Sequence, residues 1–425
     1  MEQADRKTYL CIDLKSFFAS VESVARGLDP FTTDLVVADP ARGKGAICLA
    51  VTPSLKAKGV RNRCRLFEIP DSIEYIVALP RMKKYMEVST RIYSLYLHYV
   101  CPEDIHVYSI DECFIDATQY LKMYRKTPRE FAKMLMDAVM RATGIRSTAG
   151  IGTNLFLAKV ALDVTAKHAS DFIGELDEES FKQTMWHHRP ITDIWNVGRG
   201  IAKRLEKMAI YDLYGVAHAD EDYLYDVFGV NAEFLIDHAW GREPCTIADI
   251  HAYKSKSASI SNGQILFEDY NFDDALIILQ EMVDMLVLEL VEKHLVCDSI
   301  SLYIGYSDDD IKPTGGTHKL GVYTSSRAKI MKYFIDYYNK TTSRVHPIRR
   351  LNIGLNGLEP DTYATVDFFT DKKKEKKEKD LQSAILRIKD KYGKNAIMPA
   401  ISYEDKATGR QRNGMIGGHA SGEES

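Results

Sequence analysis

The chain has 425 residues, enough for about three domains with cores of their own. Its 56 Lys and Arg residues against 60 Asp and Glu give a formal charge of −4, which excludes a histone-like or wholly polycationic nucleic-acid binder. The 45% hydrophobic and 27% charged residues exclude a mostly disordered, collagenous or low-complexity chain.

The cysteines and the hydropathy pattern bear on cellular location. Seven cysteines are scattered along the chain without a C-x-x-C pair, which is typical of reduced thiols in a cytoplasm. The first residues lack the basic-then-apolar pattern of a signal peptide, and no apolar run approaches the roughly 18 residues of a membrane span. We expect a cytoplasmic protein without a membrane partner.

Charge is unevenly distributed along the chain. Residues 41–65 hold seven Lys or Arg and no acid, and residues 311–350 hold nine against the single acid Asp336. Residues 268–310 hold twelve acids and one cation, Lys293. Both basic stretches are candidate phosphate-facing surfaces, although solvated helix faces carry similar runs.

The first 170 residues alternate strand and helix patterns. Apolar residues over Tyr9–Ile12 predict a buried strand that ends at Asp13. The following predicted elements are a helix from Phe17, a helix over 81–99, strands over 107–110 and 113–116, a helix from the capping box of Thr127 and Glu130 to Gly144, a strand over 147–151 and a helix over 154–167. Asp111 and Glu112 form the tip of the hairpin. This order predicts an α+β domain with an antiparallel or mixed sheet of the ferredoxin-like type.

The rest of the chain divides into helical, mixed and tail segments. Short helical pieces broken by Gly198 and Gly200 are predicted over 186–219, and the polar residues 246–258 predict a linker. A second α+β unit is then predicted from a long helix capped by Asp273 and Asp274, a strand over 299–306, a helix over 324–338 and a strand over 350–355. The lysine run after Asp371 predicts a solvated tether, an amphipathic segment follows over 381–392, and the Gly-rich end is expected to be mobile.

Three carboxylates are candidates for a metal site. Asp13 ends one buried strand, and Asp111 and Glu112 lie at a hairpin tip in the same predicted sheet. Acids so close repel one another unless a multivalent cation joins them, and oxygen ligands without His or Cys favour Mg²⁺ or Mn²⁺ over zinc. Neighbouring strand residues point to opposite faces, so Asp111 and Glu112 converge only if the turn reorients one of them. Turn chemistry and helix capping explain the same residues, and spacing alone leaves both interpretations open.

The segments around these carboxylates resemble the two catalytic motifs of Y-family translesion DNA polymerases. The chain reads Asp-Leu-Lys-Ser-Phe-Phe-Ala-Ser-Val-Glu over 13–22 and Tyr-Ser-Ile-Asp-Glu-Cys-Phe-Ile-Asp over 108–116. Further similar segments are Gly150–Ala161, Ala166-Lys167 and Ile194–Leu205, and the similarity continues to about Leu358, over more than 350 residues. The chain is most similar to the UmuC-like bacterial branch, the ImpB/MucB/SamB group.

The resemblance implies an α+β, multidomain right-hand polymerase. Its parts are a ferredoxin-like palm, small fingers, a helical thumb with a helix-hairpin-helix, and an α+β little-finger domain. The implied boundaries are a palm over 1–23 and 80–180, fingers over 24–79, a thumb over 181–245, a linker over 246–258, a little finger over 259–360, and a lysine-rich tether with a mobile tail over 361–425. The acidic stretch would be the outer, solvated face of the little finger.

The motifs also imply the catalytic residues. By motif match, Asp13, Asp111 and Glu112 hold two Mg²⁺ ions, for which Mn²⁺ is a substitute, and the backbone carbonyl of Leu14 is a further metal ligand. These ions promote attack of a primer 3′-hydroxyl on the α-phosphate of a dNTP. The three carboxylates are therefore the implied catalytic residues.

The nucleotide-binding residues follow from the same comparison. Phe18 occupies the steric-gate position, where an aromatic ring excludes a 2′-hydroxyl, and Phe17 is core or pocket wall; packing on a helix also explains both rings. Lys167 matches a palm lysine suited to the β- and γ-phosphates. In the fingers this chain has Pro53 and Lys56 where a common pattern has Tyr and Arg. Lys56 keeps the charge and remains the expected phosphate ligand, although a solvated helix lysine is the alternative.

The implied DNA contacts lie in two places. In the helix-hairpin-helix they are Val197, Gly198, Gly200, Lys203 and Arg204, although a tight turn between helices explains the glycines equally well. In the little finger they are Lys312, Lys319, Arg327, Arg349 and Arg350. Relatives often carry a sliding-clamp peptide at the position of Val366, Asp367, Phe368 and Phe369. This segment lacks the usual Gln and Leu, so a hydrophobic staple is an equal alternative.

The leading hypothesis is a DNA-directed DNA polymerase of the Y family. It would act as a monomer on primer-template DNA with dNTPs, in low-fidelity translesion synthesis during the DNA damage response and SOS mutagenesis. A catalytically silent DNA-binding relative is the main alternative, and a ferredoxin-like nucleotide cyclase is a third.

Overall fold

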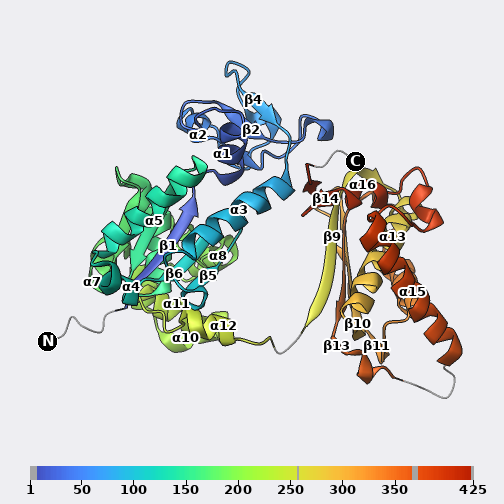
Figure 1. The fold of residues 1–425 in the computed structure, drawn as a ribbon. Coiled ribbons are helices and arrows are strands. Elements are labelled where there is room, and N and C mark those ends of the chain that lie inside the picture. The colour runs from blue at the N-terminus through green and yellow to red at the C-terminus, as the bar shows by residue number, and fades with distance from the viewer. Residues whose placement is uncertain (1–6, 256–257, 366–371, 423–425) are drawn as a thin grey trace. The chain divides into compact units, whose positions relative to one another are not determined.

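The computed structural model describes residues 7–255, 258–365 and 372–422. The chain divides into two compact units, Met1–Tyr253 and Lys254–Ser425, which are described separately (Figure 1). No helix among the described residues is both long and apolar enough to cross a membrane.

The first unit is built on a five-stranded sheet with the strand order β5-β6-β1-β7-β8. The strands are β1 Tyr9–Leu14, β5 Ile105–Val107, β6 Glu112–Asp116, β7 Ser147–Gly152 and β8 Ile173–Leu176. All neighbours are antiparallel except the parallel pair β7 and β8. The predicted mixed sheet of an α+β fold is confirmed.

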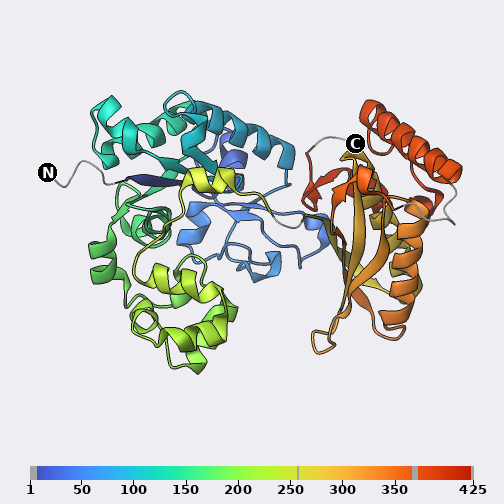
Figure 2. The same ribbon diagram turned by 90° about the horizontal axis from the view of Figure 1, so that it is seen from below.

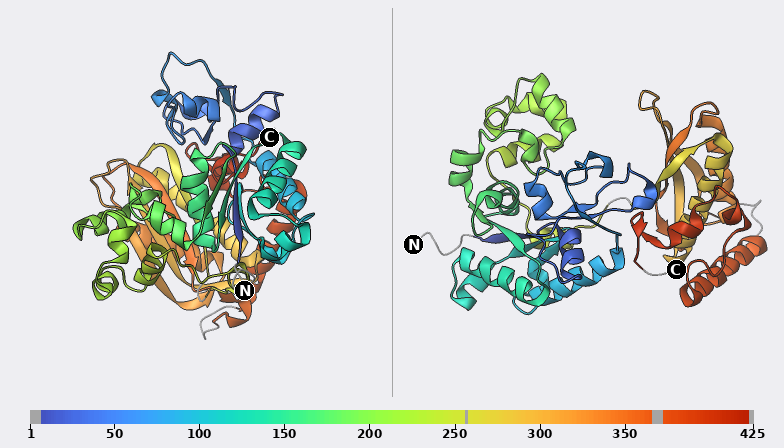
Figure 3. Two further views of the ribbon diagram at one scale, coloured as in Figure 1. Left: turned by 90° about the vertical axis from the view of Figure 1, so that its left-hand side faces the viewer. Right: turned by 90° about the horizontal axis from the view of Figure 1, so that it is seen from above.

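Helices cover both faces of this sheet. The helices α1 Phe17–Val24, α3 Met82–Tyr96, α4 Thr118–Tyr124 and α5 Pro128–Thr143 enclose one core, which includes Leu10, Ile12 and Phe131 (Figure 3). The capping box predicted for α5 is present, because the Thr127 side chain accepts the backbone N–H of Glu130. The helix ends at Gly144, whose φ of 70° is the left-handed conformation that suits glycine.

The other face packs against a helix that changes pitch. The helix predicted over 154–167 is α6 Leu155–Val160, a π-helical turn over Ala161–Thr165 and a 3₁₀ turn over Ala166–His168. Glycines in β7 permit this close packing, since a Cβ on Gly150 would lie 2.0 Å from the carbonyl oxygen of Ala158.

Two smaller modules complete the first unit. A three-stranded sheet, β2 Leu35–Val37, β3 Ala50–Val51 and β4 Ile76–Ala78, packs with α2 Pro53–Ala57 around its own core. A helical module consists of α7 Glu178–Met185, α8 Arg199–Lys207, α9 Leu213–Ala217, α10 Glu221–Phe228 and α11 Asn231–Ala239.

The predicted linker over 246–258 is partly helical. Ile247–Ala252 forms α12, which Thr246 caps by accepting the backbone N–H of Asp249. Ile247 is buried in the first unit, so this helix belongs to the domain that precedes it. The polar composition of this segment did not indicate the capped helix, which packs on the first unit through Ile247 and Ile250.

The second unit is an antiparallel sheet with two long helices on one face (Figure 2). The strand order is β11-β10-β12-β9, with β9 Ser259–Tyr270, β10 Leu295–Tyr306, β11 Thr314–Thr324 and β12 Ile348–Asn356, and β13 Glu359–Pro360 pairs with β10. The helices are α13 Phe272–Glu292 and α14 Arg327–Thr341. Asn271 caps α13 by accepting the N–H of Asp274, so the predicted capping by Asp273 and Asp274 is wrong by two to three residues. The strands β9 and β11 were not predicted.

The C-terminal segment is docked, which corrects the expectation of a solvated tether and a mobile tail. Its elements are α15 Lys372–Tyr392, a 3₁₀ turn Ala400–Tyr403, α16 Gly409–Asn413 and the strands β14 Met415–Ile416 and β15 His419–Ala420. Glu378 on α15 accepts the backbone N–H of Ala328 at 2.9 Å and the hydroxyl of Ser326 at 3.0 Å, so it caps α14. Glu375 of α15 likewise lies 2.7 Å from Lys329 Nζ of α14, so both glutamates of this helix bind the domain.

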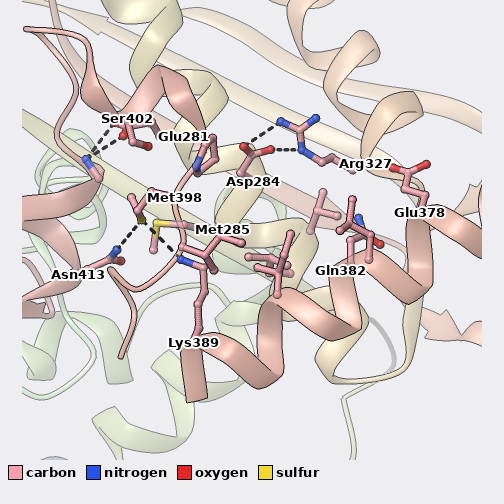
Figure 4. A pocket seen from close by; sticks show the side chains of 17 residues that line it. Glu281, Asp284, Met285, Arg327, Glu378, Gln382, Lys389, Met398, Ser402 and Asn413 are labelled. Carbon is pink, nitrogen blue, oxygen red and sulfur yellow. Dashed lines mark hydrogen bonds and ion pairs between the residues drawn. The ribbon is translucent and has the colours of Figure 1, made fainter. Parts of the chain in front are cut away.

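We expected the acidic helix α13 to be a solvated outer face, but two of its acids are buried. The carboxylate of Glu281 is buried and accepts the backbone N–H groups of Thr408 and Gly409 at 2.9–3.1 Å. Asp284 is also buried and accepts two N–H groups of Arg327 at 2.6 and 2.9 Å. A cavity of about 340 Å³, with a mostly apolar wall, separates α13 from α15 beside this ion pair (Figure 4).

Candidate active site

The sheet of the first unit brings the three predicted carboxylates together. The strands β1 and β6 are neighbours, and Asp13 and Glu112 are paired directly across them, so both side chains lie on one face. Asp111 immediately precedes β6, and its carbonyl accepts the N–H of Leu14 at 2.9 Å. The hydroxyl of Ser109 donates to Asp111 Oδ1 at 2.7 Å, which orients this carboxylate.

The carboxylates repel one another electrostatically. Burial, followed by the negative charges of Asp111 and Glu112, raises the pKa of Asp13 to about 7. A carboxyl group with this pKa is partly protonated at neutral pH, and a bound cation would favour its charged form. The donor set consists of hard oxygens with no histidine, which is the set that Mg²⁺ prefers.

A buried lysine that the sequence analysis did not single out occupies this site. Lys159 on α6 is 7% exposed, and its Nζ lies 2.7 Å from Glu112 Oε1 and 3.1 Å from Asp163 Oδ1. The thiol of Cys11 donates to the same Glu112 oxygen at 3.0 Å. Burial lowers the pKa of Lys159, but Cys11, Glu112 and Asp163 together raise it well above its usual value. The sequence feature that could have identified Lys159 is its position as a lysine within the apolar run Leu155–Val160.

Glu112 is therefore held by protein groups. Among the described residues, no cluster of three or more His, Cys, Asp or Glu side chains has the geometry of a preformed metal site. The charge of Glu112 is compensated by Lys159 in this arrangement. To bind a metal ion, Glu112 would have to contact both the ion and Lys159 with its carboxylate, or give up its contact with Lys159.

The predicted gate residue lies in a fixed aromatic and ionic cluster. The Phe18 ring stacks on Tyr85 with ring centroids 4.5 Å apart and an interplanar angle of 20°. The Tyr85 hydroxyl donates to Glu22 at 2.9 Å, and Arg81 donates to both oxygens of Glu22 at 2.9 and 2.6 Å. Phe17 is buried in the core of the first unit, as the core alternative predicted.

The predicted phosphate ligands lie near the carboxylates. Lys56 Nζ donates to the hydroxyl of Ser16 at 2.9 Å, which places the lysine of α2 beside the turn between β1 and α1. Partial desolvation lowers the pKa of Lys56, and the ammonium groups of Lys15 and Lys167 lower it further against the opposing effect of Asp13. Lys15 was not predicted as a site residue.

The helix-hairpin-helix segment has an open helix start. Gly198 precedes α8, no side chain caps this helix, and a Cβ at Gly198 or Gly200 would meet no atom within 4 Å. Internal packing therefore does not require these glycines. Val197 is buried, and Lys203 is exposed. The Arg204 guanidinium lies 4.5 Å from the Phe228 ring, so part of this side chain packs within the module.

The five predicted cations of the second unit do not share one surface. Lys319 is exposed next to the buried Leu320, and Arg350 is exposed next to the buried Leu351, so both lie on the sheet face opposite the helices. Lys312 is exposed in the loop before β11.

The other two cations are engaged by acids. Arg349 lies 3.3 Å from Asp269. Arg327 begins α14 and binds Asp284 on the helical side of the domain (Figure 4). The Arg327 guanidinium is therefore engaged by a buried carboxylate, and its role as a DNA contact stays a prediction. The clamp-peptide candidate, Val366 to Phe369, lies outside the described residues.

Comparison with known proteins agrees with this geometry. The impB/mucB/samB family matches residues 12–163, and the C-terminal domain of the same family matches residues 257–368. A Bacillus subtilis (strain 168) protein named "Putative UV-damage repair protein UvrX" is 33% identical over 99% of both chains. A protein named DNA polymerase IV 2 from Halalkalibacterium halodurans is 29% identical over 97% of this chain and 99% of its own.

A solved structure has the same fold. It is a Y-family DNA polymerase chimera of Dbh and Dpo4, with a TM-score of 0.65 and 20% sequence identity, and the match covers 83% of this chain and 99% of the chimera. The two family segments, the full-length relatives and this fold agree with the motifs around Asp13 and Asp111. The chain belongs to the impB/mucB/samB family of Y-family DNA polymerases.

Proposed function

We propose that this chain is a template-directed DNA polymerase that copies damaged template with low fidelity. The observation that carries the proposal is the placement of Asp13 and Glu112 across from each other on β1 and β6, with Asp111 in the adjoining turn. All three catalytic residues implied by the family motifs are present. A relative that had lost catalysis would be under no constraint to keep three mutually repelling, half-buried acids in one place.

The carboxylate site fits divalent metal ions. Asp13, Asp111 and Glu112, with the carbonyl of Leu14, would hold two Mg²⁺ ions, which would favour the charged form of Asp13 against the burial and the neighbouring negative charges that raise its pKa. When bound, the metal ions supply Lewis-acid activation of the primer hydroxyl and neutralise charge on the phosphates. Lys159 lies 2.7 Å from Glu112, so the chain contributes a lysine as well as the acids to the charge balance.

The nucleotide site lies on the same side of the unit. Lys56 and Lys167 would bind the β- and γ-phosphates as point cations. The stacked pair of Phe18 and Tyr85 would form the floor under the sugar, where a fixed ring clashes with a 2′-hydroxyl. With these assignments, residues 1–23 and 80–180 would act as the palm and residues 24–79 as the fingers.

Duplex DNA would be held at two backbone-binding surfaces. The open start of α8 at Gly198 and Gly200, with Lys203, suits a phosphate on the thumb, and Lys319 with Arg350 suits phosphates on the little finger. Contacts of this kind read the backbone and not the base sequence, as lesion bypass requires.

Primer extension tests the proposal. The chain with primer-template, dNTPs and Mg²⁺ should extend the primer, also past a damaged template base, and the double variant Asp111→Ala with Glu112→Ala should not. Glu175→Ala, which removes an exposed carboxylate of β8, should extend like the parent. An intact chain that binds primer-template but adds no nucleotide would instead support the alternative of a catalytically silent DNA-binding relative.

A further inference from the structure

Three lysines from separate segments converge beside the carboxylates. Lys15 follows β1, Lys56 lies on α2, and Lys167 lies in the 3₁₀ turn after α6. Lys56 donates to Ser16, the neighbour of Lys15, and the ammonium group of Lys15 lies 4.6 Å from the ring centre of Phe172. The positive charge of Lys167 lowers the pKa of both Lys15 and Lys56, so it lies near both. The sheet and the small module therefore bring three cations to one turn.

The three lysines of this cluster lack a close carboxylate partner in the part of the chain that the structure describes. Among the residues that the structure describes, none of Lys15, Lys56 and Lys167 forms an ion pair within 4.0 Å of a carboxylate. The acid that influences Lys15 and Lys56 is Asp13, which the proposed function assigns to metal ions. Three unpaired ammonium groups close together are costly unless an anion joins them.

The backbone of the same turn presents a further positive group. Ser16 has a φ of 49°, in the left-handed region that residues other than glycine seldom adopt. The eight-residue helix α1 starts directly after it, with no side-chain cap and no acid in its first turn. The N–H groups at this helix start thus point to the region of the lysines without a competing side-chain acceptor.

Phe172 is held in a conformation that supports Lys15. Its φ is 61°, which is uncommon for an aromatic residue, and its carbonyl accepts the N–H of Ala149 in β7. This placement fixes the ring under the lysine side chain. A lysine that lies over an aromatic face keeps its charge and needs no carboxylate partner.

We infer that Lys15 is a third cationic ligand for the triphosphate of the incoming nucleotide, in addition to Lys56 and Lys167. The inference rests on the proposed polymerase function and assigns a role to a residue within the first carboxylate motif. A bound triphosphate carries up to four negative charges, which matches three lysines and a helix start better than a single phosphate does. Lys15 would therefore act on nucleotide affinity and not on the chemical step.

Anion binding without catalysis tests the inference. Inorganic tripolyphosphate is titrated into the parent and the variants Lys15→Gln and Lys15→Arg by isothermal calorimetry. Lys15→Gln should weaken binding about tenfold, as expected when one charge-assisted contact is lost, and Lys15→Arg should retain most of the affinity. Lys58→Gln is the matched control, because Lys58 lies on the same segment as Lys56 but pairs with Asp34.

Kinetics separate this inference from the proposed function. In primer extension, Lys15→Gln should raise the KM for dNTP about tenfold and change kcat by less than twofold. Parent-like tripolyphosphate affinity in Lys15→Gln overturns the inference, and so does an equal loss in Lys15→Arg, which would indicate a packing role. If the parent adds no nucleotide but tripolyphosphate binding still depends on Lys15, the polymerase proposal fails and the anion site stands.

Discussion

The buried carboxylate of Glu22 offers a sharp test of how the first unit is held together. Its side chain is fully buried, and it accepts hydrogen bonds from Arg81, Tyr85 and Arg26. In Glu22→Gln one acceptor oxygen becomes an NH₂ group that faces guanidinium donors. The variant therefore loses charge-assisted hydrogen bonds and gains a donor without an acceptor.

The magnitude follows from the exposure of the partners. Removing one member of a fully buried ion pair costs about 3–5 kcal/mol, but the side chains of Arg81 and Arg26 are 34% and 36% exposed and can regain water. We expect a loss of about 2–3 kcal/mol in the free energy of unfolding, which corresponds to about 5–10 °C in Tm for a unit of this size. Urea unfolding followed by circular dichroism measures it, with Glu87→Gln, an exposed acid of α3, as the control.

The loss should also depend on pH. Burial alone raises the pKa of Glu22, but the hydrogen bonds from Arg81, Arg26 and Tyr85 outweigh it and lower the pKa. A lowered pKa means that the stabilisation is present above the unfolded value of about 4.3 and is lost as the pH falls through the folded value. The difference between parent and variant should be complete at pH 7 and shrink below about pH 4. A difference under about 0.5 kcal/mol at pH 7, or one that persists undiminished at low pH, would refute the reasoning.

The same variant has a functional consequence under the proposed function. Glu22 holds the Tyr85 hydroxyl, and Tyr85 supports the Phe18 ring from below. A looser ring excludes a 2′-hydroxyl less well, so Glu22→Gln should incorporate ribonucleotides more readily although Glu22 itself lies away from the sugar. Unchanged discrimination in a destabilised variant would show that Phe18 is held by other contacts.

Three further predictions concern the gate, the buried lysine and the C-terminal segment. Phe18→Ala should raise ribonucleotide incorporation relative to deoxynucleotide incorporation in single-nucleotide extension, and a ratio like that of the parent would remove its gate role. Lys159→Met should lower the free energy of unfolding by about 3–5 kcal/mol in EDTA, because Glu112 loses its cation, and excess Mg²⁺ should restore part of it; an equal loss with and without Mg²⁺ would contradict a metal ion near Glu112. In Gly409→Ala a Cβ would lie 2.4 Å from Glu281 Oε1, so this carboxylate must shift from its backbone N–H donors and the C-terminal segment should become more sensitive to trypsin, whereas a parent-like digestion pattern would show that the other contacts suffice.

The parts of the fold that could be predicted are those with local signals. The strand predicted to end at Asp13, which runs to Leu14, and the capping box and terminal glycine of α5 each depend on residues a few positions apart, and the structure contains them. The hairpin is also present, but its first strand is Ile105–Val107 and not 107–110, and Glu112 lies in β6 and not at the tip. Helix capping, periodicity and turn residues operate over one or two turns, so a single sequence is sufficient.

The parts that could not be predicted depend on contacts between distant residues. Lys159 meets Glu112 from 47 positions away, and the backbone N–H of Gly409 meets Glu281 across 128 positions. Every residue has a backbone N–H, so no letter in the sequence marks residues 408 and 409 as the partners of a buried acid. The glycine and lysine content of the tail predicted a solvated, mobile chain. Contacts with distant residues instead dock this segment on the second unit.

Charge is segregated along the chain, but the basic stretch 311–350 does not form a single phosphate-facing surface. The basic stretch 311–350 divides by geometry, because strand residues alternate between faces and Arg327 lies on a helix. Lys319 and Arg350 reach the open face of the sheet, whereas Arg327 neutralises Asp284 from the acidic helix α13. Part of the acidic stretch and part of the basic stretch thus cancel inside one domain, and a chain with a formal charge of −4 still has exposed cations on one sheet face, where the proposed function places DNA. Side-chain direction, and not the number of lysines and arginines in a segment, determines what DNA can meet.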